Sequence, residues 1–287
     1  MSGDKEFEFG LGDGRRIVGV IERPQATLRG WAIVAHCFSC GQDGLAAVRL
    51  SRALARSGVG VLRFDFAGAG DRDGQVADAS FAADVHEILR GLPARPVLVG
   101  ASLGGLTSLL LAGELAPGSV SAVVLVDIVP DMNPQGTQRI HSFMVDRVVE
   151  GFESLDEVAD MIADYNPHRP RPSDLDGLRH NLRRRGERWY WHWDPQFIDG
   201  SAAQPPIEVT ETDRLYAAVD TILAGGVPML LVRGQVSDLV SRDRADQFVA
   251  RFPQIAFVDV EGAGHMVAGD RNDLFADAVL DFLAHHE

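Results

Sequence analysis

The stretch from Pro96 to Leu106, PVLVGASLGGL, restricts the fold more than any other part of the chain. Its first four residues are an apolar run typical of a buried strand, and a helical pattern follows the turn at once. In that turn Ser102 is flanked by Gly100 and Gly104, which is the G-x-S-x-G pattern of a nucleophile elbow. Such a tight turn leaves no room for a Cβ at either glycine, and it exposes the serine hydroxyl. The sequence therefore predicts a nucleophilic Ser102, and the alternative is an ordinary glycine-rich strand-to-helix turn.

Other apolar runs repeat this alternation of strand and helix. After an expected opening hairpin, buried strands are predicted at residues 31–35, 59–64, 96–99, 122–128, 228–232 and 256–260. Strands that are apolar on both faces indicate an α/β fold, with a mainly parallel sheet flanked by helices. Functional sites of such sheets lie beyond the carboxyl ends of the strands, where His36, Asp65, Ser102 and Asp127 are all expected.

The rhythm breaks between residues 131 and 213. This stretch has helical patches and a proline-rich break at 166–172, but no convincing buried strand. We therefore predict a mostly helical lid at 131–213, inserted into a core formed by residues 1–130 and 214–287. A chain of 287 residues, 46% of them hydrophobic, is long enough for such a core.

Charge and composition narrow the partners and the compartment. The formal net charge of −14 argues against nucleic-acid binding and against attraction to anionic membranes. No apolar run reaches the roughly 18 residues of a membrane span, and the acidic N-terminus does not resemble a signal peptide. Two cysteines cannot build a disulfide scaffold, so a cytoplasmic location is expected.

Together these elements resemble the α/β-hydrolase fold superfamily over nearly the whole chain, apart from the interior of the lid. In that family the serine is followed along the chain by an acid and then by a histidine. The Gly262-Ala263-Gly264-His265 loop, between the last predicted strand and the last helix, resembles the loop of the family's base. The resemblance thus implies that His265 is the general base, and the alternative is a surface histidine in a glycine turn.

Two acids compete to orient His265. Asp238 follows the strand at 229–232, the position that usually carries the acid in the family. Asp127 ends the preceding core strand and resembles a variant position used by some members. We expect Asp238 and keep Asp127 as the alternative acid; the acid that is not used is expected in a lid contact or a structural ion pair.

The resemblance also implies an oxyanion hole formed by two backbone amides. One is the amide of Leu103, at the start of the helix after Ser102. The other lies in His36-Cys37-Phe38, where Phe38 is the expected donor and Cys37, which replaces the family's usual glycine, is the alternative. Cys37 and Cys40 form a C-x-x-C pattern that thioredoxin-like proteins share, but the elbow and the G-x-G-H loop disfavour redox catalysis.

Two features stand out within the predicted lid. Trp189, Trp191 and Trp193 either pack the lid onto the core or line an apolar acyl or aromatic substrate pocket. Seven arginines between Arg169 and Arg188, against three acids, form either a solvated face or a site for a substrate carboxylate.

The resemblance implies a serine hydrolase that cleaves a carboxylic ester, lactone or thioester of a small molecule through an acyl-enzyme, without cofactor or metal. Carbon–carbon bond hydrolysis and cofactor-free perhydrolysis or haloperoxidation could use the same triad, and a non-catalytic ligand-binding member is a further alternative. Epoxide hydrolases and haloalkane dehalogenases of this fold use an aspartate where this chain has Ser102. A homodimer is left open.

Overall fold

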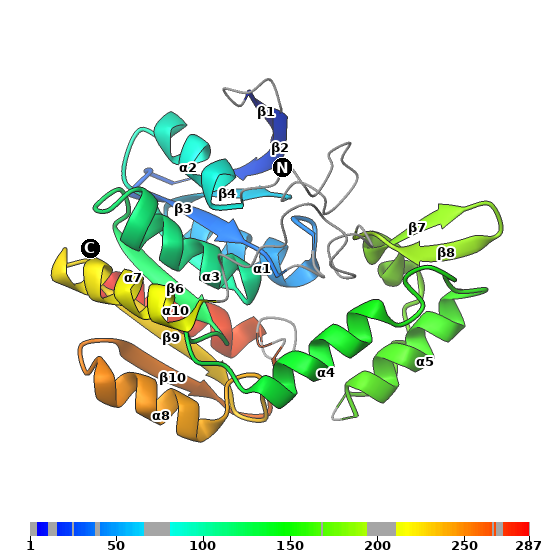
Figure 1. The fold of residues 1–287 in the computed structure, drawn as a ribbon. Helices are drawn as coiled ribbons and strands as arrows, with labels where there is room; N and C mark the ends of the chain where they lie inside the picture. The colour runs from blue at the N-terminus through cyan, green and yellow to red at the C-terminus, as the bar shows by residue number, and fades with distance from the viewer. Residues whose placement is uncertain are drawn as a thin grey trace.

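An eight-stranded sheet runs through the centre of the protein, in the order β1-β2-β4-β3-β5-β6-β9-β10 (Figure 1). The computed structural model describes residues 5–10, 16–24, 26–37, 41–65, 81–167, 169–193, 211–265, 267 and 272–286. The strands are β1 (Lys5–Gly10), β2 (Arg16–Glu22), β3 (Gly30–Ala35), β4 (Val59–Phe64), β5 (Val97–Ala101), β6 (Ala122–Val126), β9 (Met229–Gly234) and β10 (Ala256–Val260). β1 and β2 form an antiparallel hairpin, and all strands from β4 to β10 in this order are parallel, as predicted.

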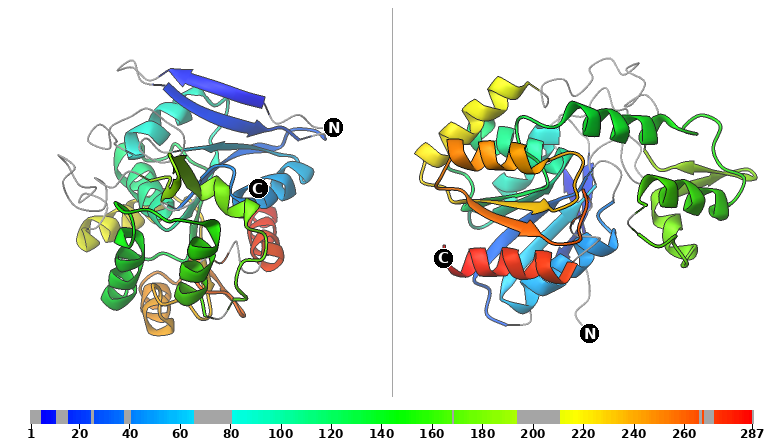
Figure 2. Two further views of the ribbon diagram at one scale, coloured as in Figure 1. Left: turned by 90° about the vertical axis from the view of Figure 1, so that its right-hand side faces the viewer. Right: turned by 90° about the horizontal axis from the view of Figure 1, so that it is seen from below.

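Helices cover both faces of the sheet because successive strand residues are apolar on both sides. Along β6, Val123 and Leu125 pack into one apolar cluster while Val124 and Val126 pack into the other. The first cluster includes side chains of α2 (Phe81–Gly91), α3 (Leu103–Leu110), the π-helix η2 (Leu111–Leu115), α7 (Thr212–Ala224) and α8 (Arg242–Arg251). The second includes those of α1 (Leu45–Arg56) and α10 (Asn272–Ala284). Figure 2 (right) accordingly shows α8 and α10 on opposite sides of the sheet.

The strand register brings the expected site residues to one edge of the sheet. Ala35 of β3 pairs with Gly100 of β5, Ala101 of β5 pairs with Val126 of β6, and Val126 pairs with Val232 of β9. His36, Ser102 and Asp127, which follow β3, β5 and β6, therefore leave the sheet at the same edge.

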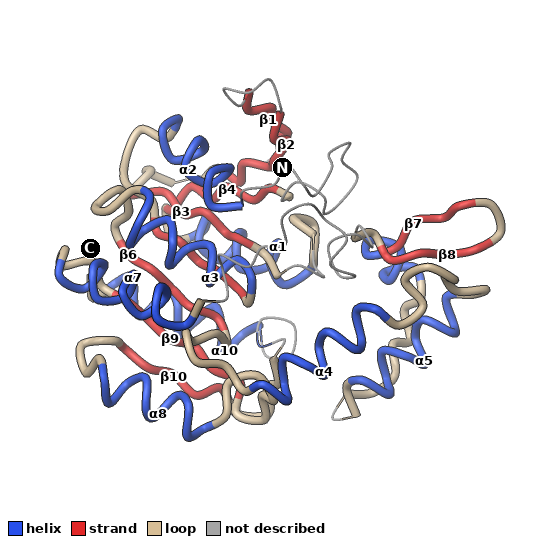
Figure 3. Tube along the Cα trace, viewed as in Figure 1, coloured by secondary structure: helices blue, strands red, loops and turns tan. Residues whose placement is uncertain are grey.

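A second group of elements lies beyond this edge and is called here the α4–β8 segment (residues 134–193). It contains α4 (Pro134–Val145), α5 (Leu155–Tyr165), the 3₁₀-helix η3 (Asp176–Asn181), β7 (Leu182–Arg185) and β8 (Arg188–Trp191). Its own apolar cluster includes Phe152, Val158 and Leu182. Figure 3 shows a hairpin, β7–β8, among helices. The helices agree with the predicted sequence patches, but the strands were not expected, and the role of residues 131–213 as a lid stays a prediction.

None of the described helices combines the length and the apolarity that a membrane crossing would require.

Close packing of α3 against the sheet depends on the glycines around Ser102. A Cβ on Gly104 would overlap the carbonyl group of Ala35, at the end of β3. A Cβ on Gly100 would overlap the backbone of Gly104 and Gly105. Because backbone atoms cannot rotate away as side chains do, both positions require glycine.

We predict that Gly104→Ala lowers the free energy of unfolding by about 3 kcal/mol, since α3 and β3 must separate to admit the methyl group. Gly30→Ala is the matched control, because a Cβ at Gly30 has no atom within 4 Å, and its effect should stay within about 0.5 kcal/mol. Urea unfolding of both variants makes the measurement, and equal stability of the two would contradict the steric account.

Candidate functional site

Ser102 lies on a sharp turn between β5 and α3. Its φ of 51° is positive, a backbone conformation that residues with a side chain rarely adopt. The turn is held because the carbonyl oxygen of Ser102 accepts hydrogen bonds from the amides of Gly105 (2.9 Å) and Leu106 (3.1 Å). Strain of this kind at a solvent-accessible serine is typical of functional sites, and the turn has the geometry that the G-x-S-x-G pattern predicts.

The first amides of α3 lie directly after Ser102. Leu103 is the first helical residue, and such amides have no acceptor within their own helix and carry a partial positive charge. They can therefore stabilise a negative oxygen beside Ser102. Phe38, the expected second donor, lies outside the described residues.

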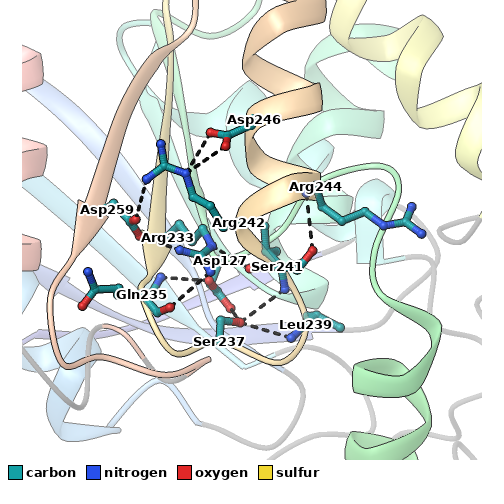
Figure 4. A network of polar contacts seen from close by, with 12 residues as sticks. Asp127, Arg233, Gln235, Ser237, Leu239, Ser241, Arg242, Arg244, Asp246 and Asp259 are labelled. Atoms are coloured by element: carbon teal, nitrogen blue, oxygen red, sulfur yellow. Dashed lines mark hydrogen bonds and ion pairs between the residues drawn. The ribbon is translucent and has the colours of Figure 1, made fainter.

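Asp127 is a completely buried carboxylate that contacts His265 (Figure 4 shows its other partners). Its Oδ2 lies 2.7 Å from Nδ1 of His265, and its Oδ1 accepts a hydrogen bond of 2.9 Å from the amide of Gly234. The hydroxyl of Ser237 lies 2.5 Å from Oδ2. This arrangement fixes the imidazole ring by its Nδ1 atom and leaves Nε2 for other partners.

Asp238 has different surroundings from those expected from the sequence. Its side chain is 54% exposed and forms an ion pair with Arg139 of α4. The described carboxylate that contacts Nδ1 of His265 is therefore that of Asp127, because the loop after β9 directs Asp238 outward to α4 while Asp127 faces the ring. Which acid orients His265 in catalysis stays a prediction.

Backbone contacts connect the strand ends that carry Ser102, Asp127 and His265. The amide of Ser102 donates to Val126, the residue before Asp127, at 3.3 Å. The amide of Asp127 donates to Val232 of β9 at 2.8 Å. In the loop after β9, the amide of Val236 donates to Ala263, two residues before His265, at 2.9 Å. The three predicted groups are thus carried by neighbouring strand ends that are bonded to one another.

His36 is buried after β3, and both of its ring nitrogens lie near oxygen atoms of the chain. Nδ1 lies 2.6 Å from the carbonyl oxygen of Cys37, and Nε2 lies 3.3 Å from the carboxylate of Asp65. The Asp65 carboxylate also accepts a hydrogen bond of 2.7 Å from the amide of Gln42. These contacts support the interpretation that His36 and Asp65 brace the turn.

Cys37 is buried and disulfide-bonded. Cys40, the one other cysteine of the sequence, lies outside the described residues. The sequence pattern did not predict this bond, which restrains Cys37 covalently.

The three tryptophans of the α4–β8 segment have two kinds of surroundings. Trp191 and Trp193 are 5% and 3% exposed, and their rings stack with centroids 4.6 Å apart. Leu103 packs against the same cluster, which therefore reaches the residue next to Ser102. Trp189 is half-buried, and the guanidinium groups of Arg179 and Arg184 lie 4.9 and 5.7 Å from its ring centroid.

Several arginines of the basic stretch bind groups of the chain itself. Arg171 pairs with Asp156 and Asp160 of α5, and Arg179 pairs with Asp176. Arg188 donates to the carbonyl oxygens of Glu150 and Gly151 and to the carboxylate of Glu153. These contacts favour a structural role for this part of the stretch.

A cleft of about 520 Å³ lies between α4 and α5 and is lined by both apolar and charged side chains. Phe143, Phe152 and Met161 are among the apolar ones, and Tyr165 lines the cleft at the end of α5. Burial raises the pKa of the Tyr165 hydroxyl; Arg139 opposes this shift and Asp238 adds to it. None of the predicted catalytic residues lines this cleft.

Comparisons with known proteins agree on one family. The model of the "Alpha/beta hydrolase family" matches residues 31–278. The chain is 30% identical to "Esterase Rv0045c" of Mycobacterium tuberculosis over 69% of its own length and 64% of that protein's length. It is 27% identical to the "3-hydroxybutyrate-oligomer hydrolase" of Cupriavidus necator over 70% of its own length and 71% of that protein's length. A solved α/β hydrolase of Novosphingobium aromaticivorans superposes with a TM-score of 0.79 at 21% identity, covering 99% of each chain.

We predict that Trp191→Ala destabilises the α4–β8 segment by about 3–5 kcal/mol, because removal of the buried indole ring leaves a cavity among Phe143, Phe152 and Trp193. Trp189→Ala is the control in the same strand and should cost about 1 kcal/mol, since that ring is half-exposed. Chemical unfolding and limited proteolysis of the segment measure both effects. Equal resistance of the two variants to protease would refute the assignment of Trp191 to the segment's core.

Proposed function

The chain belongs to the α/β hydrolase family, and from this premise we propose that it cleaves a carboxylic ester, lactone or thioester with Ser102, His265 and Asp127 as its triad. The observation that carries the proposal is the 2.7 Å contact between buried Asp127 and Nδ1 of His265, at the edge where Ser102 leaves β5. The acid is Asp127 in this proposal because Asp238 is engaged by Arg139.

The first half of the reaction forms an acyl-enzyme. The Asp127 carboxylate accepts a hydrogen bond from Nδ1–H of His265, so that Nε2 is the free base that removes the hydroxyl proton of Ser102. Oγ of Ser102 attacks the carbonyl carbon, and the oxygen becomes negative. The amides of Leu103 and of Phe38, with Cys37 as the alternative second donor, stabilise this oxyanion, each by roughly 2.7–4 kcal/mol.

The acyl-enzyme is complete when the bond from the carbonyl carbon to the leaving oxygen or sulfur breaks. Protonated His265 gives its Nε2 proton to the departing alcohol or thiol, and the acyl group stays on Ser102. The second half of the reaction releases the acid. Water then takes the place of the alcohol and loses a proton to His265 as it attacks the acyl carbon. The bond between the acyl carbon and Oγ of Ser102 then breaks as His265 gives the proton taken from water to Oγ. The acid leaves, and the serine hydroxyl is restored without any cofactor.

The choice of ester chemistry and of an apolar substrate rests on two supports. Two relatives are named an esterase and a hydrolase of 3-hydroxybutyrate oligomers, and the elbow residue is a serine. The cluster of Trp191 and Trp193 reaches Leu103, whose amide is the proposed oxyanion donor. An apolar acyl or aromatic group bound beside Ser102 would lose water contacts against these side chains.

We predict that Ser102→Ala lowers kcat for p-nitrophenyl esters by a factor on the order of 10⁶, because no other group forms the acyl-enzyme. Esters of graded chain length define the preferred acyl group, and a fluorophosphonate probe should label the wild-type protein but not the variant. A wild-type protein that resists the probe, or a variant that keeps its activity, counts against the proposal.

We predict that Asp127→Asn lowers kcat by about 10⁴-fold, since the amide stabilises the wrong tautomer of His265. The matched variant Asp238→Asn should stay within about threefold of wild type, because an exposed ion pair contributes at most about 1 kcal/mol. Steady-state kinetics on one ester separates the two acids. The opposite order of effects would return the orienting role to Asp238.

A further inference from the structure

We propose that Ser237 is a positioning residue of the triad, whose hydroxyl holds the Asp127 carboxylate in the orientation that binds Nδ1 of His265. This inference rests on the proposed function. Ser237 contacts Asp127 directly, at 2.5 Å, and acts on the reacting groups only through it. Nothing in the sequence pattern sets Ser237 apart, because it is one serine in a loop after a strand.

The direction of the Ser237 hydroxyl proton follows from its neighbours. Oγ accepts hydrogen bonds from the amides of Leu239 (3.2 Å) and Val240 (3.3 Å), which engage both lone pairs (Figure 4). The proton therefore points to the remaining partner, Oδ2 of Asp127. Ser237 is only 8% exposed, so its side chain is largely shielded from solvent.

The carboxylate depends on these donors because it has no access to solvent. A buried negative charge is stable only when hydrogen bonds replace its water shell. Gly234 donates to Oδ1, whereas Ser237 and His265 share Oδ2. Without the Ser237 hydroxyl, the contact with Nδ1 of His265 would be the one described hydrogen bond left to stabilise the negative charge on Oδ2.

The charged side chains of the surrounding elements are engaged with other groups. Arg233 of β9 binds Asp259 and the carbonyl oxygens of Gln235 and Val240. Other ion pairs in these loops and helices join Asp238 to Arg139, Asp131 to Arg244, and both Asp246 and Asp259 to Arg242. Glu261 lies in the loop that leads to His265, where its side chain is exposed. Ser237 and Gly234 are thus the described donors, besides His265, that contact the Asp127 carboxylate.

The test compares Ser237→Ala with wild type in kcat, KM and the pH dependence of kcat/KM. We expect kcat to fall about tenfold with KM within about twofold, because Ser237 touches Asp127 and not the substrate. The acid limb of kcat/KM should move to higher pH. A carboxylate with one donor fewer stabilises protonated His265 more strongly, so the free base appears only at higher pH.

Two further variants separate positioning from folding. Ser237→Thr keeps the hydroxyl and should return the acid limb to its wild-type position. Ser241→Ala removes the N-cap of α8 in the same loop, where Oγ accepts from the amide of Arg244, without contact to Asp127. It should lower the Tm and leave the acid limb unchanged.

The outcomes distinguish this inference from the proposed function. Full activity of Asp127→Asn would overturn both. Loss of activity in Asp127→Asn together with an unmoved acid limb in Ser237→Ala would overturn only the role of Ser237. In the Asp127→Asn background Ser237→Ala should lower kcat no further, and an additive loss would also overturn the role of Ser237.

A second variant covers the case in which Ser237→Ala does not fold. Ser237→Cys keeps the shape of the side chain with a weaker donor and should also move the acid limb of kcat/KM to higher pH. An acid limb that does not move in this variant would overturn the role of Ser237.

Discussion

The burial of the Asp127 carboxylate is the constraint on which the arrangement of the sheet edge that carries Ser102, Asp127 and His265 depends. With no solvent to stabilise the charge, three chain segments must supply donors: the strand end of β9, the loop after it, and the His265 loop. These segments approach one another closely, since a Cβ on Gly234 would overlap the carbonyl oxygens of Ala263 and Gly264. Asp127 itself adopts a positive φ of 50° to face them. A small backbone shift of any of these segments would therefore leave a buried charge without a partner.

Much of this edge could be predicted from the sequence, for a physical reason. Parallel strands buried on both faces appear as continuous apolar runs, and their register brings every carboxyl end to one side. Ser102 could be identified because the turn excludes a Cβ on each flank, which only glycine satisfies. The hairpin β7–β8 could not be predicted in this way. Three consecutive arginines follow Leu182 in β7, so the sequence lacks the alternation of apolar and polar residues that indicates a half-buried strand.

The choice between the two acids was beyond the sequence for a different reason. Asp127 and Asp238 both follow core strands, so the strand pattern places both near the same edge. Adjacent residues in an irregular loop can face opposite directions, and here Ser237 is 8% exposed while the Asp238 side chain is 54% exposed. A shift of one position along this loop would exchange the buried and the exposed side chain. The path of the loop, which no local pattern encodes, thus decides which carboxylate meets the imidazole ring.

The same loop also connects the sheet edge that carries Ser102 and Asp127 to the α4–β8 segment. Arg139 pairs with Asp238 and donates to the carbonyl oxygen of Tyr165 at the end of α5. An exposed ion pair contributes at most about 1 kcal/mol, so it does not by itself fix the segment. Tighter contacts come from the backbone: the amide of Asn133 donates to Leu239, and Gly136 lies against Asp238 with no room for a Cβ. The start of α4 is therefore joined to the loop that holds Asp127, whereas the far hairpin is tied mainly to its own segment. Changes in the hairpin should accordingly alter the surroundings of Leu103 and the substrate more readily than the geometry of Asp127 and His265.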